Sequence, residues 1–139
     1  MRILIAIVAA FMTSQAMAAD YLGKVIAVSD GDTFTMEAGG GKVRVRICGI
    51  DAPEWGHAGY GQAAGAFMIE GKTVHCLQVG EGTVCDGRSK PTNRDRIVAQ
   101  CFLYAVDIAE QTIKSGTACD WSKFSGGKYK ISDTTCSRK

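Results

Sequence analysis

Apolar and polar residues alternate along the first half of the chain in short segments. These segments cover residues 21–28, 33–37 and 43–48; turn residues separate them, with glycines at 39–41. Because consecutive side chains of a strand point to opposite faces, Val45 and Ile47 share one face and Arg46 lies on the other. Cys48 falls on the face of Arg46. The pattern predicts three strands that form a meander.

The second half of the chain combines helical spacing with two further strand patterns. Apolar residues recur at helical spacing over residues 60–71, and a second helix is expected from an N-cap at Asp107 to a stop at Gly116. Strands are predicted at 73–79 and 96–104. Five strands with a helix after the third indicate a mainly β (α+β) domain. We expect a small five-stranded barrel of the OB type with two or three helices.

Residues 1–18 have the organisation of a secretory signal peptide. A positive charge at Arg2 precedes an apolar run over residues 3–12, and small residues follow up to Ala18. The apolar run is too short to span a bilayer. We therefore expect cleavage after Ala18 and a single, soluble, monomeric domain of residues 19–139. This domain would be exported to the periplasm or the medium, without membrane association in its mature form.

Composition narrows the class of protein without identifying a partner. Hydrophobic residues make up 46% and charged residues 22% of the chain, which excludes a wholly disordered chain, a collagen and a coiled-coil rod. The formal net charge is only +2. If a nucleic acid is bound, a local patch of positive charge must bind it, because the global field is weak.

All six cysteines follow the predicted cleavage site, and an even number in an exported domain indicates disulfides. No Cys-x-x-Cys pair occurs, so a zinc site is not expected. Many pairings are possible from sequence alone. The scheme that the strand order favours is Cys76–Cys101 across two neighbouring strands, Cys119–Cys136 around the tail and, from the remaining two, Cys48–Cys85.

Two short acidic stretches and one arginine concentrate the candidate chemistry. Asp-Gly-Asp-Thr occupies residues 30–33, Ile-Asp-Ala-Pro-Glu occupies residues 50–54, and Arg46 lies on the strand before the second stretch. Carboxylate and carbonyl oxygens are the ligands that calcium prefers, and an arginine nearby suits a phosphate. Taken singly, the first stretch is typical of a turn and the second of a helix start. The spacing does not match an EF-hand.

Together these stretches resemble a known family. Val-Ser-Asp-Gly-Asp-Thr-Phe at residues 28–34 is followed by Val-Arg-Val-Arg-Ile-Cys-Gly-Ile-Asp-Ala-Pro-Glu at 43–54 and by Arg-Ile-Val-Ala at 96–99. Over about residues 22–121 the chain resembles the staphylococcal nuclease-like (thermonuclease) family. The resemblance implies an OB-type barrel and calcium-dependent hydrolysis of phosphodiester bonds in DNA or RNA.

The resemblance also implies roles for individual residues. The Ca2+ ligands would be Asp32, Asp51 and the backbone carbonyl of Ala52. Glu54 would act as the general base or orient the attacking water. Arg46 and Arg96 would bind the scissile phosphate and stabilise the charge that develops on it. Nucleic acid would be the partner, as substrate.

The chain departs from the family pattern just before Arg96. Thr-Asn-Arg-Asp-Arg at residues 92–96 replaces the family's Asp-x-Tyr-Gly-Arg, so Arg94 and Asp95 stand where a tyrosine and a glycine are expected. Arg94 is therefore a candidate substrate contact. The departure concerns substrate preference more than the core chemistry.

Aromatic and histidine residues near the predicted site have several interpretations. Trp121 belongs to a basic, aromatic tail that we expect a disulfide to pin over the barrel. The alternative is a tail that stacks on single-stranded nucleic acid. Trp55 is expected to pack beside the site, and His57 and His75 are expected to have surface or structural roles.

Two classes of function remain open. The first is a secreted or periplasmic calcium-dependent nuclease, an endonuclease-type phosphodiesterase. The alternative is a non-catalytic nuclease-like binding module, which could be an accessory in exopolysaccharide production, since a fold does not by itself imply an activity. The presence of both carboxylates, Glu54 and both arginines favours the enzyme.

Overall fold

The computed structural model describes residues 18–54, 56–59, 61, 63 and 68–131. Its first three strands are β1 (Asp20–Asp30), β2 (Thr33–Ala38) and β3 (Gly41–Ile47), and each pairs antiparallel with the next. Gly39 and Gly40 join β2 to β3, and both have a positive φ, which a tight hairpin turn requires. The predicted meander is confirmed.

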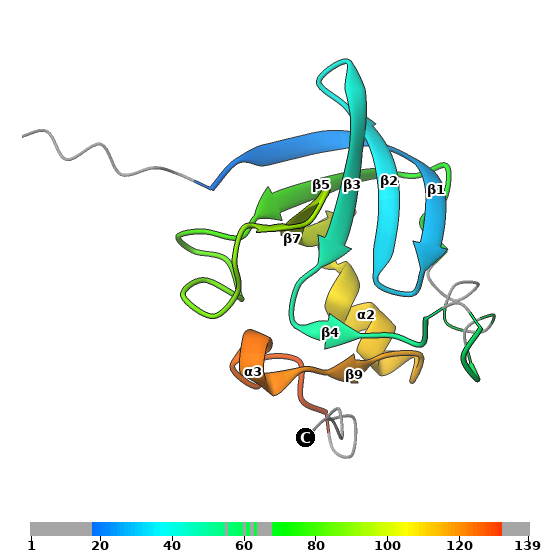
Figure 1. Ribbon diagram of the computed structural model, residues 1–139, viewed down its shortest axis with the longest axis vertical. Helices are drawn as coiled ribbons and strands as arrows, with labels where there is room; N and C mark the ends of the chain where they lie inside the picture. Colours follow the sequence, from blue (N-terminus) through cyan, green and yellow to red (C-terminus); the bar gives the residue numbers. More distant parts are fainter. Residues whose placement is uncertain (1–17, 55, 60, 62, 64–67, 132–139) are drawn as a thin grey trace, which may run out of the picture.

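Two later strands close the barrel. β5 (Thr73–Gln78) pairs antiparallel with both β1 and β7 (Arg96–Leu103), and β7 runs parallel to β3 with Ile97 opposite Val45. Each of these five strands therefore pairs with two others of the five, and the sheet curls into a closed ring (Figure 1). The protein is a mainly β, OB-type five-stranded barrel, as the alternation predicted.

The inside of the barrel is filled by the apolar faces of these strands. Phe34, Met36, Val45 and Ile47 are completely buried there, which confirms the face assigned to Val45 and Ile47. The Cys76–Cys101 disulfide lies in the same core. Its two residues are register partners on β5 and β7, with their Cα atoms 4.1 Å apart.

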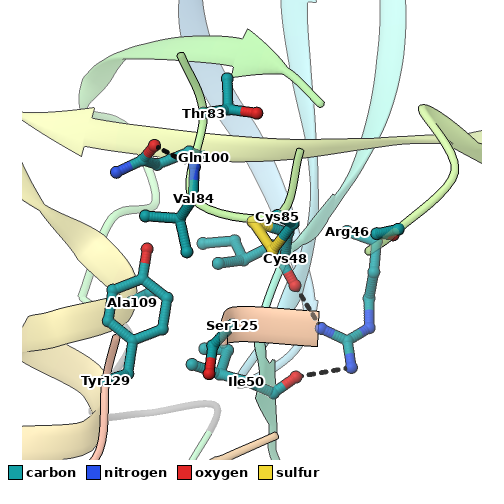
Figure 2. Close-up of a disulfide and its surroundings, with 12 residues drawn as sticks. Arg46, Cys48, Ile50, Thr83, Val84, Cys85, Gln100, Ala109, Ser125 and Tyr129 are labelled. Carbon is teal, nitrogen blue, oxygen red and sulfur yellow. Dashed lines mark hydrogen bonds between the residues drawn. A yellow bond between two sulfur atoms is a disulfide. The ribbon is translucent and has the colours of Figure 1, made fainter. Parts of the chain in front are cut away.

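The other disulfide, Cys48–Cys85, lies at the end of β3 (Figure 2). The prediction that Cys48 shares a strand face with Arg46 is wrong, because β3 ends at Ile47 and the chain turns there. Cys48 is instead buried with Cys85, Val79 and Val98 in a second, smaller apolar cluster. Both pairings follow the predicted scheme. The third, Cys119–Cys136, stays a prediction, because Cys136 is outside the described residues.

Helix α2 (Ile108–Lys114) packs against one end of the barrel (Figure 1). The predicted N-cap is confirmed, since Oδ1 of Asp107 accepts a hydrogen bond from the backbone N–H of Ala109 at 2.9 Å. Ile108, Ala109 and Ile113 are buried in the core. Of the other predicted helix, over residues 60–71, residues 60, 62 and 64–67 lie outside the described residues; Gly61 and Ala63 are helical, and residues 68–71 are not.

The C-terminal tail is attached to the domain by backbone pairing as well as by packing. Strand β9 (Cys119–Asp120) pairs with β4 (Ile50–Asp51), and helix α3 (Ser122–Ser125) follows β9. Tyr129 is 2% exposed and donates its hydroxyl to Oδ2 of Asp107 at 2.8 Å. The tail thus supports β4, which carries Asp51.

The short strands β6 (Thr92–Asn93) and β8 (Val106–Asp107) pair with β7.

Across the described part of the chain, no helix has the length and apolar character needed to cross a membrane. Residues 1–17 of the predicted signal peptide are not among the described residues.

Candidate active site

The turn between β1 and β2 holds Asp32 in a fixed position. Oδ1 of Asp30 accepts a hydrogen bond from the backbone N–H of Asp32 at 3.0 Å, and the carbonyl of Asp32 accepts one from Ile47 at 2.8 Å. Oδ2 of Asp32 accepts a third from the backbone N–H of Ala52 at 2.8 Å. The two acidic stretches of the sequence therefore meet at Asp32, which is 4% exposed.

Gly31 allows this close approach. A Cβ atom at position 31 would lie 2.8 Å from Cβ of Ala52 and 3.0 Å from Cβ of Ala63, closer than side chains normally pack. The absence of a side chain at Gly31 therefore lets the turn lie directly against the residue that follows Asp51.

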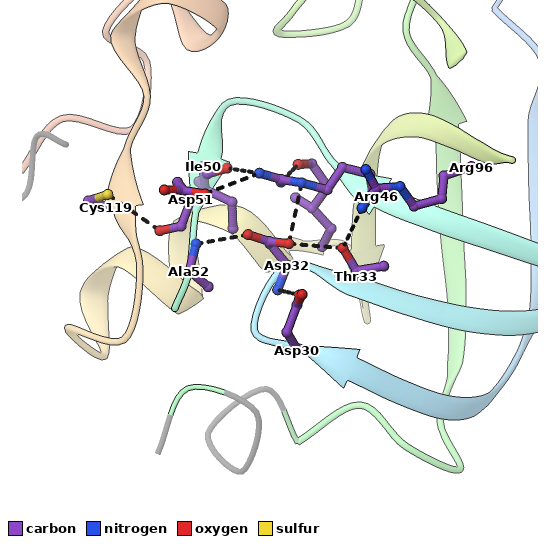
Figure 3. A network of polar contacts seen from close by, with 10 residues as sticks. Asp30, Asp32, Thr33, Arg46, Ile50, Asp51, Ala52, Arg96 and Cys119 are labelled. Atoms are coloured by element: carbon purple, nitrogen blue, oxygen red, sulfur yellow. Dashed lines mark hydrogen bonds and ion pairs between the residues drawn. The ribbon is translucent and has the colours of Figure 1, made fainter. Parts of the chain in front are cut away.

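Arg46 lies between the two carboxylates that are predicted calcium ligands, those of Asp32 and Asp51 (Figure 3). Its Nε lies 3.3 Å from Oδ1 of Asp32, and its Nη2 lies 3.6 Å from Oδ1 of Asp51. Nη2 also donates to the carbonyl of Ile50 at 2.8 Å, and Nη1 donates to the carbonyl of Ile47. One guanidinium thus lies between both carboxylates, and both face the same small region.

The negative charge of the Asp32 carboxylate is energetically unfavourable in this buried position. Burial raises the pKa of the Asp32 carboxyl to about 7, although Arg46 acts in the opposite direction. The nearby Asp30 adds to the rise. A cation beyond Arg46 would therefore be favoured beside Asp32, because it would stabilise the charged form.

Thr33 connects Asp32 to the second predicted arginine. Its hydroxyl donates to Oδ1 of Asp32 at 2.9 Å and accepts from Nη1 of Arg96 at 3.4 Å. The site is therefore a continuous chain of polar contacts from Arg96 through Thr33 and Asp32 to Arg46. Thr33 was not among the residues predicted to form the site. Its position in the Asp-Gly-Asp-Thr stretch, opposite Arg46 on β3, was the signal that could have indicated one.

Glu54 lies outside this buried network, on an open hollow. Arg44, Arg94 and Arg96 line the same hollow, together with Ser29, Asp30 and Asp95. Glu54 is exposed, and within the described residues no hydrogen bond or ion pair reaches its carboxylate. The structure thus places the predicted base on the same hollow as Arg96, with a carboxylate that is open to water.

The predicted substrate residue Trp121 lines a different hollow, together with Arg46, Asn93 and Phe124. The rings of Trp121 and Phe124 pack edge to face, with centroids 4.7 Å apart. Arg94, in contrast, lines the hollow of Glu54. The two substrate candidates are therefore on two separate hollows, each lined by one of the predicted phosphate-binding arginines.

The histidines are not part of the site. His75 lies on β5, where it pairs with Asp20 and lies near the ring of Phe102. His57 is exposed in the segment after Glu54. Trp55 is outside the described residues, so its expected packing beside the site stays a prediction.

The donor atoms at Asp32 and Asp51 fit a hard divalent cation. Both are carboxylates, and they converge on one guanidinium, which shows that this region favours positive charge. Within the described residues there is no group of three or more histidine, cysteine, aspartate and glutamate side chains that could hold a metal. Backbone carbonyls and water would have to complete the coordination. For Ala52, whose carbonyl is a predicted ligand, the contact seen is that of its N–H with Asp32.

A scan against protein-family models finds no family that matches this chain, and a search of the curated proteins finds no relative.

Proposed function

We propose that this protein is a calcium-dependent nuclease that hydrolyses phosphodiester bonds of DNA or RNA, as the resemblance to the staphylococcal nuclease-like family implies. The observation that carries the proposal is the polar chain Arg96–Thr33–Asp32–Arg46, with the exposed Glu54 on the hollow that Arg96 also lines. It combines two arginines, two carboxylates for a cation and a carboxylate open to water.

In this mechanism the arginines bind the phosphate and Glu54 handles the proton. Arg96 and Arg46 would donate hydrogen bonds to the non-bridging phosphate oxygens, whose negative charge grows as water attacks phosphorus. Glu54 would accept a proton from that water, the bond from phosphorus to the leaving oxygen would break, and the leaving oxygen would keep the electron pair and take a proton from solvent. Calcium held by Asp32 and Asp51 would supply further positive charge next to the phosphate.

Aromatic side chains beside Arg46 support a nucleic acid as the substrate. Trp121 and Phe124 line the hollow that contains Arg46, so a base next to a phosphate at Arg46 could stack there. The two disulfides agree with an exported enzyme that acts in the periplasm or the medium.

A nuclease-like binding module is the second candidate, and one observation favours it. Arg46 is already paired with two carboxylates and two backbone carbonyls, as in an ion cluster that only stabilises the fold. Such a module, for example an accessory in exopolysaccharide production, would bind its partner without calcium-dependent cleavage.

Cleavage assays distinguish the calcium-dependent nuclease from the binding module. The oxidised protein is incubated with single- and double-stranded DNA and RNA, first with calcium and then with excess chelator. We expect cleavage that stops in chelator and falls about 10²-fold in Glu54→Gln, with His57→Ala as the matched exposed control that keeps full activity. Cleavage that persists in chelator would contradict the calcium-dependent mechanism. No cleavage under any condition, with retained binding, would favour the module.

A further inference from the structure

Arg44 lies directly beside Arg96 on the neighbouring strand. The two residues are register partners on the parallel strands β3 and β7, where backbones lie about 4.8 Å apart. Both line the hollow that contains Glu54. A second guanidinium is therefore available next to the one that the proposed mechanism uses.

The turn between β6 and β7 brings a carboxylate to Arg44. Asn93 and Arg96 are register partners, so Arg94 and Asp95 form a two-residue turn, in which Arg94 has a left-handed φ of 57°. Asp95 forms an ion pair with Arg44 across the two strands. The hydrogen bond from Arg44 holds the pKa of the Asp95 carboxyl below its usual value, and Arg96 contributes to the same shift.

This ion pair differs from the buried contacts of Arg46. The side chains of Arg44 and Asp95 are 44% and 61% exposed, whereas that of Arg46 is 14% exposed. Exposed ion pairs contribute little to stability, because water screens them and the side chains lose freedom on pairing. A phosphate offers a guanidinium the same geometry as a carboxylate, so it can replace Asp95 at little cost.

We propose that Arg44 is a second phosphate-binding residue and that Asp95 is its competing internal ligand, so that the site selects substrates with two neighbouring phosphates. The inference rests on the proposed nuclease function and extends it to the substrate class. One phosphate would lie at Arg96, and a second would take the place of Asp95 on Arg44. An oligonucleotide would satisfy both positions, whereas an isolated phosphodiester would leave the Arg44–Asp95 pair intact.

Two probes of equal size test this selection. They are the trinucleotide TpTpT, which carries two phosphodiesters, and the same molecule with one phosphodiester replaced by a neutral methylphosphonate. Affinities are measured in excess chelator by displacement of a fluorescein-labelled thymidine oligonucleotide. We expect wild-type protein to bind TpTpT about tenfold more tightly than the methylphosphonate, the usual effect of one charged hydrogen bond.

Four variants test whether Arg44 and Asp95 cause the preference for TpTpT. Arg44→Ala should abolish the preference for TpTpT, and Asp95→Asn should increase the affinity for TpTpT several-fold. Lys42→Ala removes the same charge from the same strand outside the hollow, and Asp86→Asn removes a carboxylate from the 80–91 loop. Both controls should keep the wild-type preference.

Cleavage of DNA with calcium, measured in parallel, separates two kinds of failure. If the wild-type protein cleaves DNA but Arg44→Ala keeps the full preference for TpTpT, or Asp95→Asn leaves the affinity unchanged, the inference is overturned and the proposed function stands. If the wild-type protein binds neither probe and does not cleave DNA, both are overturned.

Discussion

Nε of Arg46 lies 3.3 Å from Oδ1 of Asp32, although the two residues are fourteen positions apart in the sequence. Strand β2 and the hairpin turn to β3 lie between them in the chain. The cause is the strand register. Thr33, which follows Asp32, is the partner of Arg46 across β2 and β3. The pairing of the two strands therefore places an arginine beside a carboxylate that burial would otherwise destabilise.

The two arginines should differ in what they contribute to stability. Arg46→Ala and Arg96→Ala should each lower kcat/KM by about 10²-fold, because each removes one stabiliser of the phosphate charge. Arg46→Ala should also lower the free energy of unfolding by about 3 kcal/mol, since it leaves Asp32 buried without its cation. Arg96 has a contact with Thr33 at 3.4 Å, and its loss should cost much less.

Calcium-dependent cleavage assays and urea denaturation measure these two effects, with Lys42→Ala as the control that removes a positive charge elsewhere on β3. An Arg96→Ala variant with full activity would remove Arg96 from the mechanism.

The calcium requirement should depend on both carboxylates. Asp32→Asn and Asp51→Asn each remove one negative charge from the proposed metal ligands, and we expect the calcium concentration for half-maximal activity to rise at least about tenfold. A calcium titration of cleavage measures this. Asp86→Asn, on the 80–91 loop, should leave the titration unchanged. An unchanged requirement in both site variants would place the cation elsewhere.

Gly31→Ala should disturb the site through packing alone. The added methyl group would meet Cβ of Ala52 and Cβ of Ala63, so the turn that holds Asp32 must move away from Ala52. We expect a loss of about 1–3 kcal/mol in stability and a raised calcium requirement. Thermal unfolding and the calcium titration detect these changes. Gly41→Ala is the matched control, because a Cβ at that position meets no atom within 4 Å.

Stability at alkaline pH should depend on Tyr129. Burial, with Asp107 nearby, raises the pKa of the Tyr129 hydroxyl above its usual value of 10.0. Above about pH 10 the unfolded chain therefore loses this proton while the folded protein keeps it, and stability falls as the pH rises, by up to about 1.4 kcal/mol per pH unit.

Tyr129→Phe should cost about 1–2 kcal/mol at neutral pH, because the hydrogen bond to Asp107 is lost, and should flatten the alkaline decline. Urea denaturation from pH 8 to pH 11 measures both effects. Tyr104→Phe, at a side chain that is 82% exposed, should retain the wild-type profile. An equally steep decline in Tyr129→Phe would contradict the assignment.

The two disulfides should affect activity unequally. Removing either with paired alanines should cost about 3–4 kcal/mol, because the unfolded chain gains freedom. Cys48 lies two residues after Arg46 (Figure 2), whereas Cys76 and Cys101 lie on strands that already pair in the main core. We therefore expect cleavage to fall about tenfold or more only in Cys48→Ala/Cys85→Ala. Equal losses in both double variants, measured well below their melting temperatures, would contradict a local effect.

Alternation by itself determined the five long strands, because a half-buried strand requires apolar residues at every second position, as at Val45 and Ile47. Local chemistry likewise determined the cap at Asp107, which depends on residues close in sequence. The acidic stretches and Arg46 could be selected as candidates because carboxylates suit a cation and an arginine suits a phosphate. The strand order indicated the Cys76–Cys101 pairing.

Only the tertiary structure decided which of these groups meet. The parallel pairing of β3 with β7 joins segments distant in sequence, and it places Arg96 beside Arg44 while Thr33 links Arg96 to Asp32. The pattern of alternation predicted a barrel but not which residues face each other across β3 and β7, because that register depends on strand tilt and stagger around the whole barrel. For the same reason the backbone pairing of the tail with β4 and the burial of Tyr129 could not be predicted, since both depend on the surface that the closed barrel offers.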